Sequence, residues 1–500
     1  MKGSSRTMIV YKPFFIIALT SVLIFSMTGT SYQQVELFFD EDGVIMEEEG
    51  EGGDAAPEEG IEEEEVTDEE GVTIEEEEEE GDAAPEEGGE EPCIGYEAGE
   101  NTIAINCDAS FRDVIRTIPD PEILEEEDEE GQYLLNANLR VSDGVTFAMT
   151  SAEDGLQYLK IMGENGIIVH GRIEISGVII TSWDPETDLP ISQTANGTVP
   201  RAYMNFRVSE GGFIEDSEVA YLGYAQPPRR GIDLGESTYG PSHDFAIRNS
   251  SIHDNWMGFY SAGSYNIIID GNEFFNNIRY AIDPHTATHN MTVSNNKIYN
   301  NNGIAVICSL NCYDVIFEEN EVYNNAGSGL MFSRATHDST IRNNVIYNQY
   351  GSAYPISISE SQNNEIYGNT ISSSTTGISV HNPLQLDEDG MSSGNRIYDN
   401  TFDGVQNAIR AVASNDNIFS DNTFANVTDF HYIMTSDASM NIEDQTFNMT
   451  NVRGVTGANT LSIRNSGTII IDNTLNHDTD IEPYTQLLTG QTVNINSSDD

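Results

Sequence analysis

A short asparagine-containing motif recurs along the middle of the chain at a nearly constant interval, and this repeat constrains the fold more than any other feature. Its copies begin at Asn249, Asn272, Asn296, Asn320, Asn344 and Asn369, 23 to 25 residues apart, and continue at Asn400 and Asn422. Self-similarity at a fixed period of this length is the signature of a repeat architecture. The leucine pattern of leucine-rich repeats is absent, and the ankyrin and tetratricopeptide periods do not fit.

The period predicts a single-stranded parallel β-helix. One coil would hold three short strands separated by turns, and each strand would pair with its equivalent about 4.8 Å away in the next coil. Asparagine tolerates a left-handed backbone at the turns and can hydrogen-bond to its neighbours along the stack. We therefore expect an all-β fold with three strands per coil from about Val141 to Asn422, with one column made of Asn272, Asn296, Asn320 and Asn344.

The repeat also predicts which side chains point inward. Equivalent positions in four successive copies hold only apolar residues and should face the interior: Phe259, Ile282, Val306 and Leu330. Asp283 and His285 have the opposite parity, so they should share one outer face. On that face Tyr260 should neighbour Asp283 from the preceding coil, and Arg334 should lie two coils after His285, roughly 10 Å along the axis.

The N-terminal residues are typical of a secretory signal. Three basic residues, Lys2, Arg6 and Lys12, precede an apolar run from Phe14 to Met27, and small polar residues follow. The run is short for a spanning helix, which needs about 20 residues, although an uncleaved anchor stays open. We expect a secreted, periplasmic or cell-surface protein with no membrane contact beyond such an anchor.

Composition divides the remainder into further segments. From Glu36 to Glu91 the sequence is acidic and of low complexity, with too few apolar residues to offset the entropy of folding, so we expect no stable structure there. Ser110 should cap a short helix that ends before Pro119. The expected organisation is a signal or anchor at 1–31, a disordered acidic segment at 32–92, an N-terminal cap at 93–140, the β-helix at 141–475 and a tail at 476–500. Strand-like runs occur at Tyr133–Val141, Thr146–Met149, Leu156–Ile161, Gly166–Ile175 and Val178–Thr181.

Charge and cysteine content exclude several classes of partner. With 84 acidic against 21 basic residues, the formal net charge is −63, so nucleic acid and anionic membranes should be repelled.

The cysteines form two natural pairs, Cys93 with Cys107 and Cys308 with Cys312. Because the second pair flanks one turn, we expect it to be near enough to bridge. Neither spacing is that of a zinc site, so no cofactor is expected, although calcium stays open.

One strand breaks the repeat's own rule. Where flanking coils hold mostly apolar or small residues, Tyr280-Ala-Ile-Asp-Pro-His carries a carboxylate and an imidazole two residues apart, with Arg279 just before. Pro284 removes a donor from the strand ladder, and such departures are where functional sites are expected. An Asp–His pair that only closes a turn is the alternative. Further polar candidates near this face are Tyr260, Arg230 and Arg334, followed by His253, Arg229 and Lys297.

The same residues resemble a known family. Tyr280-Ala-Ile-Asp-Pro-His is similar to the Tyr-Gly-x-Asp-Pro-His motif of the mannuronan C5-epimerases, which are right-handed β-helix enzymes acting on alginate. Four further segments resemble the secreted, periplasmic-type branch of that family: Tyr133-Leu-Leu-Asn-Ala-Asn, Ile180-Thr-Ser-Trp-Asp-Pro-Glu-Thr, Tyr221-Leu-Gly-Tyr and Gly258-Phe-Tyr. The resemblance extends roughly from Ser110 to Asn422.

The resemblance implies a catalytic set and a substrate. Tyr280 and His285 would be the acid and base that act at C5 of a uronate, with Asp283 near the substrate carboxylate and Arg279 or Arg334 neutralising its charge. We expect these residues to line one open groove and to bind an anionic uronic-acid polysaccharide. A lyase on the same fold and a non-catalytic cell-envelope or adhesion protein are the alternatives. A groove blocked by the insertion at His381–Gly394 would favour the latter.

The chain departs from the family pattern at three places. Thr286 follows the motif where the family usually has an acidic residue, and Ala281 replaces the motif's glycine. In the next coil Asn301-Asn302-Gly303 stands where the family often has a basic residue or histidine before the glycine. This last change removes an expected partner of the substrate carboxylate.

Overall fold

The computed structural model describes residues 21–28, 31–39, 45–46, 92–235, 240–350, 353–382, 392–435, 438–443, 450–454, 460–464, 469–472 and 493–496. They belong to two compact units, Met1–Glu91 and Pro92–Asp500. In the first unit β1 (Ser21–Thr28), β2 (Ser31–Phe39) and β3 (Ile45–Met46) pair antiparallel in that order. Among the described residues there is no helix long and apolar enough to cross a membrane.

The strands of the first unit correct one expectation. The end of β2 and the whole of β3 fall inside the segment from Glu36 that we expected to lack structure. The physical reason is local composition, since residues 35–39 and 44–46 are mostly aliphatic and aromatic and come before the glutamate runs. The rest of that segment, residues 47–91, lies outside the described residues.

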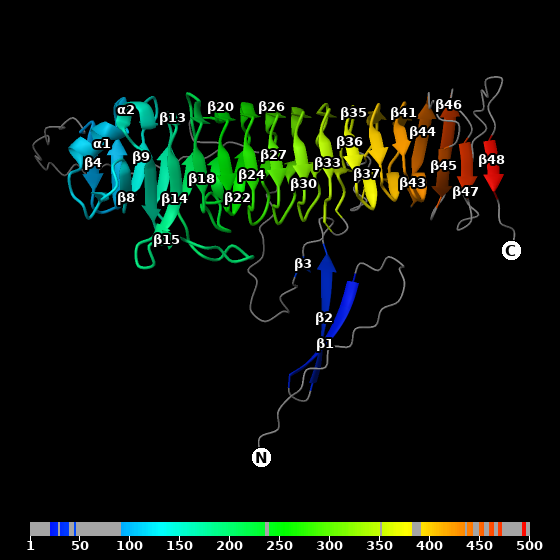
Figure 1. Ribbon diagram of the computed structural model, residues 1–500, viewed down its shortest axis with the longest axis horizontal. Coiled ribbons are helices and arrows are strands. Elements are labelled where there is room, and N and C mark those ends of the chain that lie inside the picture. Colours follow the sequence, from blue (N-terminus) through cyan, green and yellow to red (C-terminus); the bar gives the residue numbers. More distant parts are fainter. Residues whose placement is uncertain are drawn as a thin grey trace, which may run out of the picture. The chain divides into compact units, whose positions relative to one another are not determined.

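The second unit is a right-handed β-helix built from three long parallel sheets, as the row of strands from β4 to β48 in Figure 1 shows. We name each sheet after its strand at the candidate site. The β25 sheet contains β4 (Ile94–Glu97), β5 (Thr102–Ile105), β9 (Asn138–Val141), β12 (Gly166–Val169), β16 (Tyr203–Phe206), β19 (Gly231–Leu234), β22 (Met257–Ala262), β25 (Ile282–His285), β28 (Val306–Ser309), β31 (Leu330–Ser333), β34 (Ile356–Ser359), β37 (Thr376–His381), β40 (Asn407–Val412), β43 (Phe430–Thr435), β45 (Thr450–Gly454), β47 (Ile469–Asp472) and β48 (Val493–Asn496).

The other two sheets supply the second and third strand of each coil. The β26 sheet contains β6 (Ala109–Ser110), β10 (Thr146–Thr150), β13 (Arg172–Ser176), β17 (Gly212–Glu215), β20 (His243–Arg248), β23 (Tyr265–Asp270), β26 (His289–Ser294), β29 (Tyr313–Glu318), β32 (Thr340–Arg342), β35 (Glu365–Tyr367), β38 (Arg396–Tyr398), β41 (Asn417–Ser420), β44 (Ser439–Glu443) and β46 (Thr460–Arg464). The β27 sheet contains β7 (Leu124–Glu126), β8 (Gln132–Leu135), β11 (Tyr158–Met162), β14 (Ile179–Asp184), β18 (Glu218–Ala220), β21 (Ser251–His253), β24 (Glu273–Phe275), β27 (Lys297–Tyr299), β30 (Glu321–Tyr323), β33 (Val345–Tyr347), β36 (Thr370–Ser372), β39 (Thr401–Asp403) and β42 (Thr423–Ala425), and β15 (Leu189–Pro190) pairs antiparallel with β14.

The interior is a stack of apolar side chains in register. The expected inward column is confirmed, because its four members are paired from strand to strand and fully buried: Phe259, Ile282, Val306 and Leu330. Nearly all coils contribute to one continuous apolar core. Burial of such side chains stabilises each coil only against its two neighbours, as in other solenoids.

Asparagine side chains form hydrogen-bonded columns at the turns, as the repeat predicts. The amide Nδ2 of Asn296 donates to Asn320 Oδ1 at 3.0 Å, and its backbone N–H donates to the same oxygen at 3.0 Å. The same pair of bonds recurs from Asn272 through Asn400 to Asn422. These bonds satisfy the buried backbone donors where the chain leaves the sheet.

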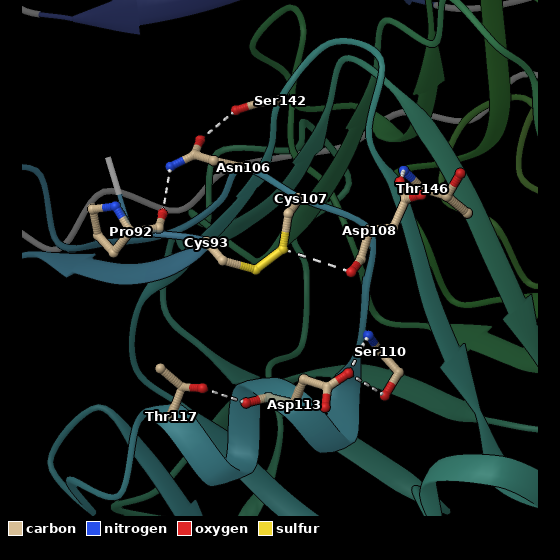
Figure 2. Close-up of a disulfide and its surroundings, with 10 residues drawn as sticks. All are labelled: Pro92, Cys93, Asn106, Cys107, Asp108, Ser110, Asp113, Thr117, Ser142 and Thr146. Atoms are coloured by element: carbon tan, nitrogen blue, oxygen red, sulfur yellow. Dashed lines mark hydrogen bonds between the residues drawn. A yellow bond between two sulfur atoms is a disulfide. The ribbon is translucent and has the colours of Figure 1, made fainter. Parts of the chain in front are cut away.

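The N-terminal end carries a short helix and a disulfide. Ser110 precedes α1 (Phe111–Thr117), and its backbone N–H donates to the Asp113 carboxylate at 3.1 Å, which confirms the expected capped helix. A second short helix, α2 (Ser151–Asp154), follows β10. Figure 2 shows the Cys93–Cys107 disulfide beside Asn106, whose Oδ1 accepts from Ser142 at 2.6 Å.

One local expectation needs correction. The runs Tyr133–Val141 and Gly166–Ile175 are each two strands, β8 with β9 and β12 with β13, because a coil corner interrupts them. Cys308 and Cys312 are buried free cysteines in the described structure, and that they lie near enough to bridge stays a prediction. Both side chains face the apolar core, where Cys312 Sγ donates to the Ser309 carbonyl at 3.4 Å.

Candidate active site

β25 carries the two polar residues that break the repeat. Its pairing with β22 aligns Tyr260 with Asp283, as expected, and Ala262 with His285. Toward β28, pairing is formed at Ile282 with Val306 and at His285 with Ser309, and Pro284 lies between them without an N–H to donate. The strand therefore pairs with β28 at both ends, whereas its centre lacks one hydrogen bond of the strand ladder.

Asp283 lies on the outer side of the sheet but is almost fully buried, with 4% of its surface exposed. Its Oδ1 has no hydrogen-bond partner among the described residues. Burial raises the pKa of Asp283 to about 7, against the opposing effect of three arginines, Arg279, Arg230 and Arg334. A carboxyl with this pKa is protonated in a large share of molecules at neutral pH and can donate a hydrogen bond.

His285 is half-buried beside Asp283, and its pKa shifts in the opposite direction. Burial, together with Arg334 and Arg230, lowers the pKa of His285 to about 4. Its Nδ1 is 2.6 Å from Thr286 Oγ1, and its ring lies 5.8 Å from that of Tyr260. When Nδ1 carries the proton and donates to Thr286, Nε2 is left as an acceptor. At neutral pH the imidazole is thus uncharged, and Nε2 can serve as an acceptor.

An ion-paired group supports the site from the preceding coils. Asp233, with 1% exposure, is held by Arg230 at 2.7 Å and by Arg207 at 3.1 Å. The Arg230 guanidinium also lies 3.8 Å from the centre of the Tyr260 ring, in a cation–π contact. Asp233 precedes Tyr260 in the same outward column, so this group fixes Arg230 and Tyr260 next to Asp283.

Tyr280 precedes β25 and belongs to an apolar cluster on the outside of the sheet. This outer cluster consists of Trp256, Met257, Tyr280, Ile304, Ile307 and Met331 and is separate from the interior core. Tyr280 therefore lies at a corner, outside the inward alternation of the strand. The exposed Arg279 lies 4.9 Å from its ring centre and donates to its hydroxyl at 3.4 Å. This contact fixes the position of the Tyr280 hydroxyl beside the guanidinium.

The third arginine near Asp283 is Arg334, which lies two coils after β25. Arg334 follows Ser333, which pairs with Ser309, which in turn pairs with His285. It is exposed, and its charge acts on both Asp283 and His285. The structure therefore brings together seven of the residues singled out in the sequence, namely Arg230, Tyr260, Arg279, Tyr280, Asp283, His285 and Arg334.

The side chains of the site are more buried than those lining an open groove would be. Tyr280 is 9% and Asp283 4% exposed, and Tyr280 packs within the outer cluster. Outward parity on a strand therefore does not mean exposure here. Of the insertion at His381–Gly394, residues 383–391 lie outside the described residues, so its effect on the groove stays a prediction.

Three further candidates from the sequence are engaged elsewhere. His253 lies on β21 in the β27 sheet, with Nδ1 2.8 Å from Asp254 and Nε2 3.3 Å from Glu218. Arg229 pairs with Glu164 at 3.1 Å, and Lys297 pairs with Glu273 at 3.7 Å. Throughout the described part of the chain, no group of three or more His, Cys, Asp or Glu side chains could hold a metal ion.

Sequence reasoning missed Arg207 and Asp233. The signal was available, because Asp233 occupies the outward position one coil before Tyr260 and two coils before Asp283. The repeat there is interrupted by a register shift between Gly231 and Ile232, which hides the alignment. Ser309 was also missed, although its hydroxyl is buried next to His285 and has no hydrogen-bond partner among the described residues.

Comparison with known proteins identifies the fold. Residues 231–383 match the family model described as "Right handed beta helix region". The crystal structure of the periplasmic alginate epimerase AlgG superposes with a TM-score of 0.53 at 18% identity and covers 79% of this chain and 85% of that one. At this identity the likeness establishes a shared fold and nothing further.

Sequence comparison finds a partial similarity to one group of enzymes. The mannuronan C5-epimerase of Pseudomonas aeruginosa is 26% identical over 180 residues, which are 33% of this chain and 32% of that protein. The mannuronan C5-epimerase of Pseudomonas fluorescens is 28% identical over 151 residues, 27% of each chain. The alignments thus span about a third of the length of these relatives or less. The chain is thus similar in sequence to mannuronan C5-epimerases over about a third of its length or less, and part of it matches the right-handed β-helix model.

Proposed function

We propose that this chain epimerises uronate residues at C5, converting mannuronate to guluronate within an alginate-like polysaccharide. One observation carries the proposal: a buried carboxyl with a raised pKa and an imidazole with a lowered pKa share one strand face, Asp283 and His285. Arginines from three coils surround them. The relationship to the mannuronan C5-epimerases supports the same reaction.

The first step is removal of the C5 proton. That proton is weakly acidic until the charge of the neighbouring carboxylate is neutralised. Protonated Asp283 donates a hydrogen bond to one carboxylate oxygen, and Arg279 and Arg334 supply positive charge. Nε2 of neutral His285 accepts the proton, and the electron pair moves into the carboxylate to form an enediolate.

The second step returns a proton to the other face of the sugar. The Tyr280 hydroxyl, polarised by Arg279, donates its proton to C5, and the electron pair of the enediolate forms the new C–H bond. The configuration at C5 is thereby inverted. His285 then loses its proton and Tyr280 regains one by exchange with water, which resets the site.

The departure at Asn301-Asn302-Gly303 fits this assignment. Asn301 is 1% exposed and belongs to a second asparagine column, where its Nδ2 donates to Asn325 Oδ1 at 2.9 Å. It is therefore committed to the fold and leaves recognition of the substrate carboxylate to arginines. Arg279 and Arg334, both exposed, take that role in the proposal.

The test is incubation of the full chain with polymannuronate in heavy water. We expect solvent deuterium at C5, detected by NMR, with guluronate as the product. His285→Ala should lower the rate at least about a hundredfold, because a positioned general base contributes that much. His337→Ala is the matched control, since His337 lies between β31 and β32, stacks on Tyr313 of β29 and pairs with Asp338 at 2.8 Å.

The same experiment separates the alternatives. Unsaturated uronate ends, detected by their ultraviolet absorbance, would show that the intermediate expels the linked sugar and that the chain is a lyase. Wild-type exchange in His285→Ala would remove His285 from the mechanism. Absence of exchange on every uronate polymer tested would leave a non-catalytic β-helix.

A further inference from the structure

Outside the candidate active site, some asparagines of the chain lie in a sequence context that allows covalent modification. The chain contains six Asn-x-Ser/Thr sequences, the acceptor motif for N-linked glycans. Four of them have described side chains, and they begin at Asn196, Asn249, Asn290 and Asn426. The side chains of the other two lie outside the described residues. Because such motifs also arise by chance in an asparagine-rich chain, the surroundings of each asparagine must decide between them.

Three of the four asparagines are built into the coils. Asn249, Asn290 and Asn426 have left-handed backbone conformations, with φ of 50°, 48° and 53°. Asn290 lies within β26, where its Nδ2 donates to Asn266 Oδ1 at 2.6 Å. The Nδ2 of Asn426 donates to Asp403 Oδ1 at 2.7 Å, and the motif of Asn249 continues into β21. Presenting these motifs to an enzyme requires opening a coil, which costs more free energy than opening a loop.

Asn196 lies outside the three sheets. It belongs to the connection 191–202 between β15 and β16, which leaves the row of coils beside β15 in Figure 1. Asn196 is exposed, and in the described part of the chain its Nδ2 donates to no acceptor. Gly197, with φ of 68°, is buried against the Trp256 ring, whereas Asn196 and Thr198 on either side of it are exposed. The acceptor nitrogen is therefore accessible without any unpairing of strands.

A buried arginine holds the base of this connection. Arg201, 1% exposed, donates to the carbonyl of Ile191 at 3.2 Å and to that of Gly223 at 2.9 Å. Within the loop, Gln193 Nε2 donates to the Val199 carbonyl at 2.8 Å, and Gln193 Oε1 accepts from the Val199 N–H at 2.9 Å. The two ends of the loop are thus tied to each other and to the next coil, so its tip is presented in a defined conformation.

Two hydroxyls bond to the amide oxygen of Asn196. Thr194 Oγ1 donates to Asn196 Oδ1 at 2.8 Å. Thr198 Oγ1, the hydroxyl of the acceptor motif, donates to the same oxygen at 3.3 Å. When the amide loses an Nδ2 proton, negative charge develops on this oxygen, and both hydroxyls stabilise it. The arrangement therefore makes Nδ2 easier to deprotonate and a better nucleophile.

We propose that Asn196 is an N-glycosylation site of the exported chain. Nδ2 attacks C1 of an oligosaccharide carried on a polyprenyl diphosphate and forms a C–N bond. The C1–O bond breaks, the diphosphate leaves with its electron pair, and a carboxylate of the oligosaccharyltransferase takes the Nδ2 proton. The N-terminal sequence, typical of a secretory signal, would bring the chain to the compartment in which such enzymes act. This site is independent of the proposed epimerase reaction.

The experiment incubates the folded full chain, purified from a host without this pathway, with an oligosaccharyltransferase that requires only Asn-x-Ser/Thr and with its polyprenyl-diphosphate oligosaccharide. Mass spectrometry of glycopeptides measures the occupancy of each motif. We expect occupancy at Asn196 at least about tenfold above that at Asn290 or Asn426, because strands open less readily than a loop. Isolated peptides that contain the same motifs are the reference, and their occupancies should differ far less.

The hydroxyl of the motif provides the matched control. Thr198→Ser keeps a hydroxyl and should retain most of the occupancy at Asn196. Thr198→Val has a similar shape without the hydroxyl and should lower this occupancy at least about tenfold. Full occupancy in Thr198→Val, or equal occupancy of Asn196 and Asn290 in the folded chain, would overturn the proposal. An unmodified Asn196 in the folded chain or in its peptide would overturn it as well.

Discussion

Asp283 and His285 are two residues apart, yet their pKa values move in opposite directions for the same reason. Burial opposes the charged form of each group, so it raises the pKa of the carboxyl to about 7 and lowers that of the imidazole to about 4. Between these values the site holds an uncharged acid and an uncharged base side by side. A pair of neutral groups can accept an anionic uronate without adding negative charge to it.

The rate of C5 exchange should therefore pass through a maximum between about pH 4 and pH 7. It should fall below about pH 4 as His285 becomes protonated and can no longer accept a proton. It should also fall above about pH 7, as Asp283 loses the proton that it donates to the substrate carboxylate. The measurement is kcat/KM for deuterium incorporation across this range, since that ratio reports the free enzyme.

Asp283→Asn tests the alkaline side of this profile. The amide keeps a donor and cannot ionise, so the variant should retain part of the activity and lose the decline above about pH 7. Asp338→Asn, an exposed carboxylate beside His337, is the control and should leave the profile unchanged. An unaltered alkaline decline in Asp283→Asn would assign that ionisation to another group.

At the scale of single residues, the sequence predicts which side chains form the site better than it predicts how buried they are. The parity of Asp283 and His285 and the pairing of Tyr260 with Asp283 followed from the period of the repeat. The burial of Asp283 did not, because alternation alone predicts an exposed side chain at an outward position. The place of Tyr280 was also hidden, since it precedes the strand and alternation does not apply there.

Among the elements, the strands are short and the turns carry much of the specificity. Many strands have three or four residues, too few to fix a register by themselves. The asparagine columns set the register, because each side chain bonds to the equivalent residue of the next coil and to a backbone carbonyl. Stacked aromatic rings add to this on the β27 sheet, where Tyr299 and Tyr323 lie 5.0 Å apart.

Asn320→Ala should destabilise the fold by about 2–5 kcal/mol, because it leaves several buried polar groups without partners. Asn320 Nδ2 donates to Val293 O at 2.9 Å and to Asn344 Oδ1 at 3.0 Å, and its Oδ1 accepts two bonds from Asn296. The measurement is the urea midpoint followed by circular dichroism.

Asn302→Ala provides the comparison for this variant. Asn302 is exposed and its backbone N–H bonds to the Asn277 carbonyl, which alanine preserves, so the change should be within about 0.5 kcal/mol. Equal midpoints for Asn320→Ala and Asn302→Ala would contradict a structural role of the column.

The elements that the sequence predicts well are those with a strong local signal. The recurring asparagines predicted the columns, and Ser110 with the apolar face of Phe111 and Val114 predicted α1. The corners inside Tyr133–Val141 and Gly166–Ile175 were not predicted, although small and polar residues mark them, Asn136 with Ala137 and His170 with Gly171. Spacing also predicted the pairing of Cys93 with Cys107, which the structure joins, whereas Cys308 and Cys312 are free cysteines buried in the core.

For the whole molecule, charge is distributed unevenly. About a third of the acidic residues lie between Glu36 and Glu91, where no basic residue accompanies them. In the β-helix, arginines from three coils gather around Asp283. A protein of net charge −63 can therefore still offer an anionic polymer a local region of favourable potential.

Removal of residues 47–91 should lower KM for polymannuronate severalfold at low salt, because fewer negative charges then repel the incoming polymer. The difference should vanish near 1 M salt, where the Debye length is about 3 Å and distant charges no longer act. A Gly/Ser segment of the same length in place of residues 47–91 separates charge from chain length and should behave like the deletion. An identical KM in all three proteins at low salt would show that the acidic segment has no electrostatic influence on substrate capture, and the local arginines alone would then account for it.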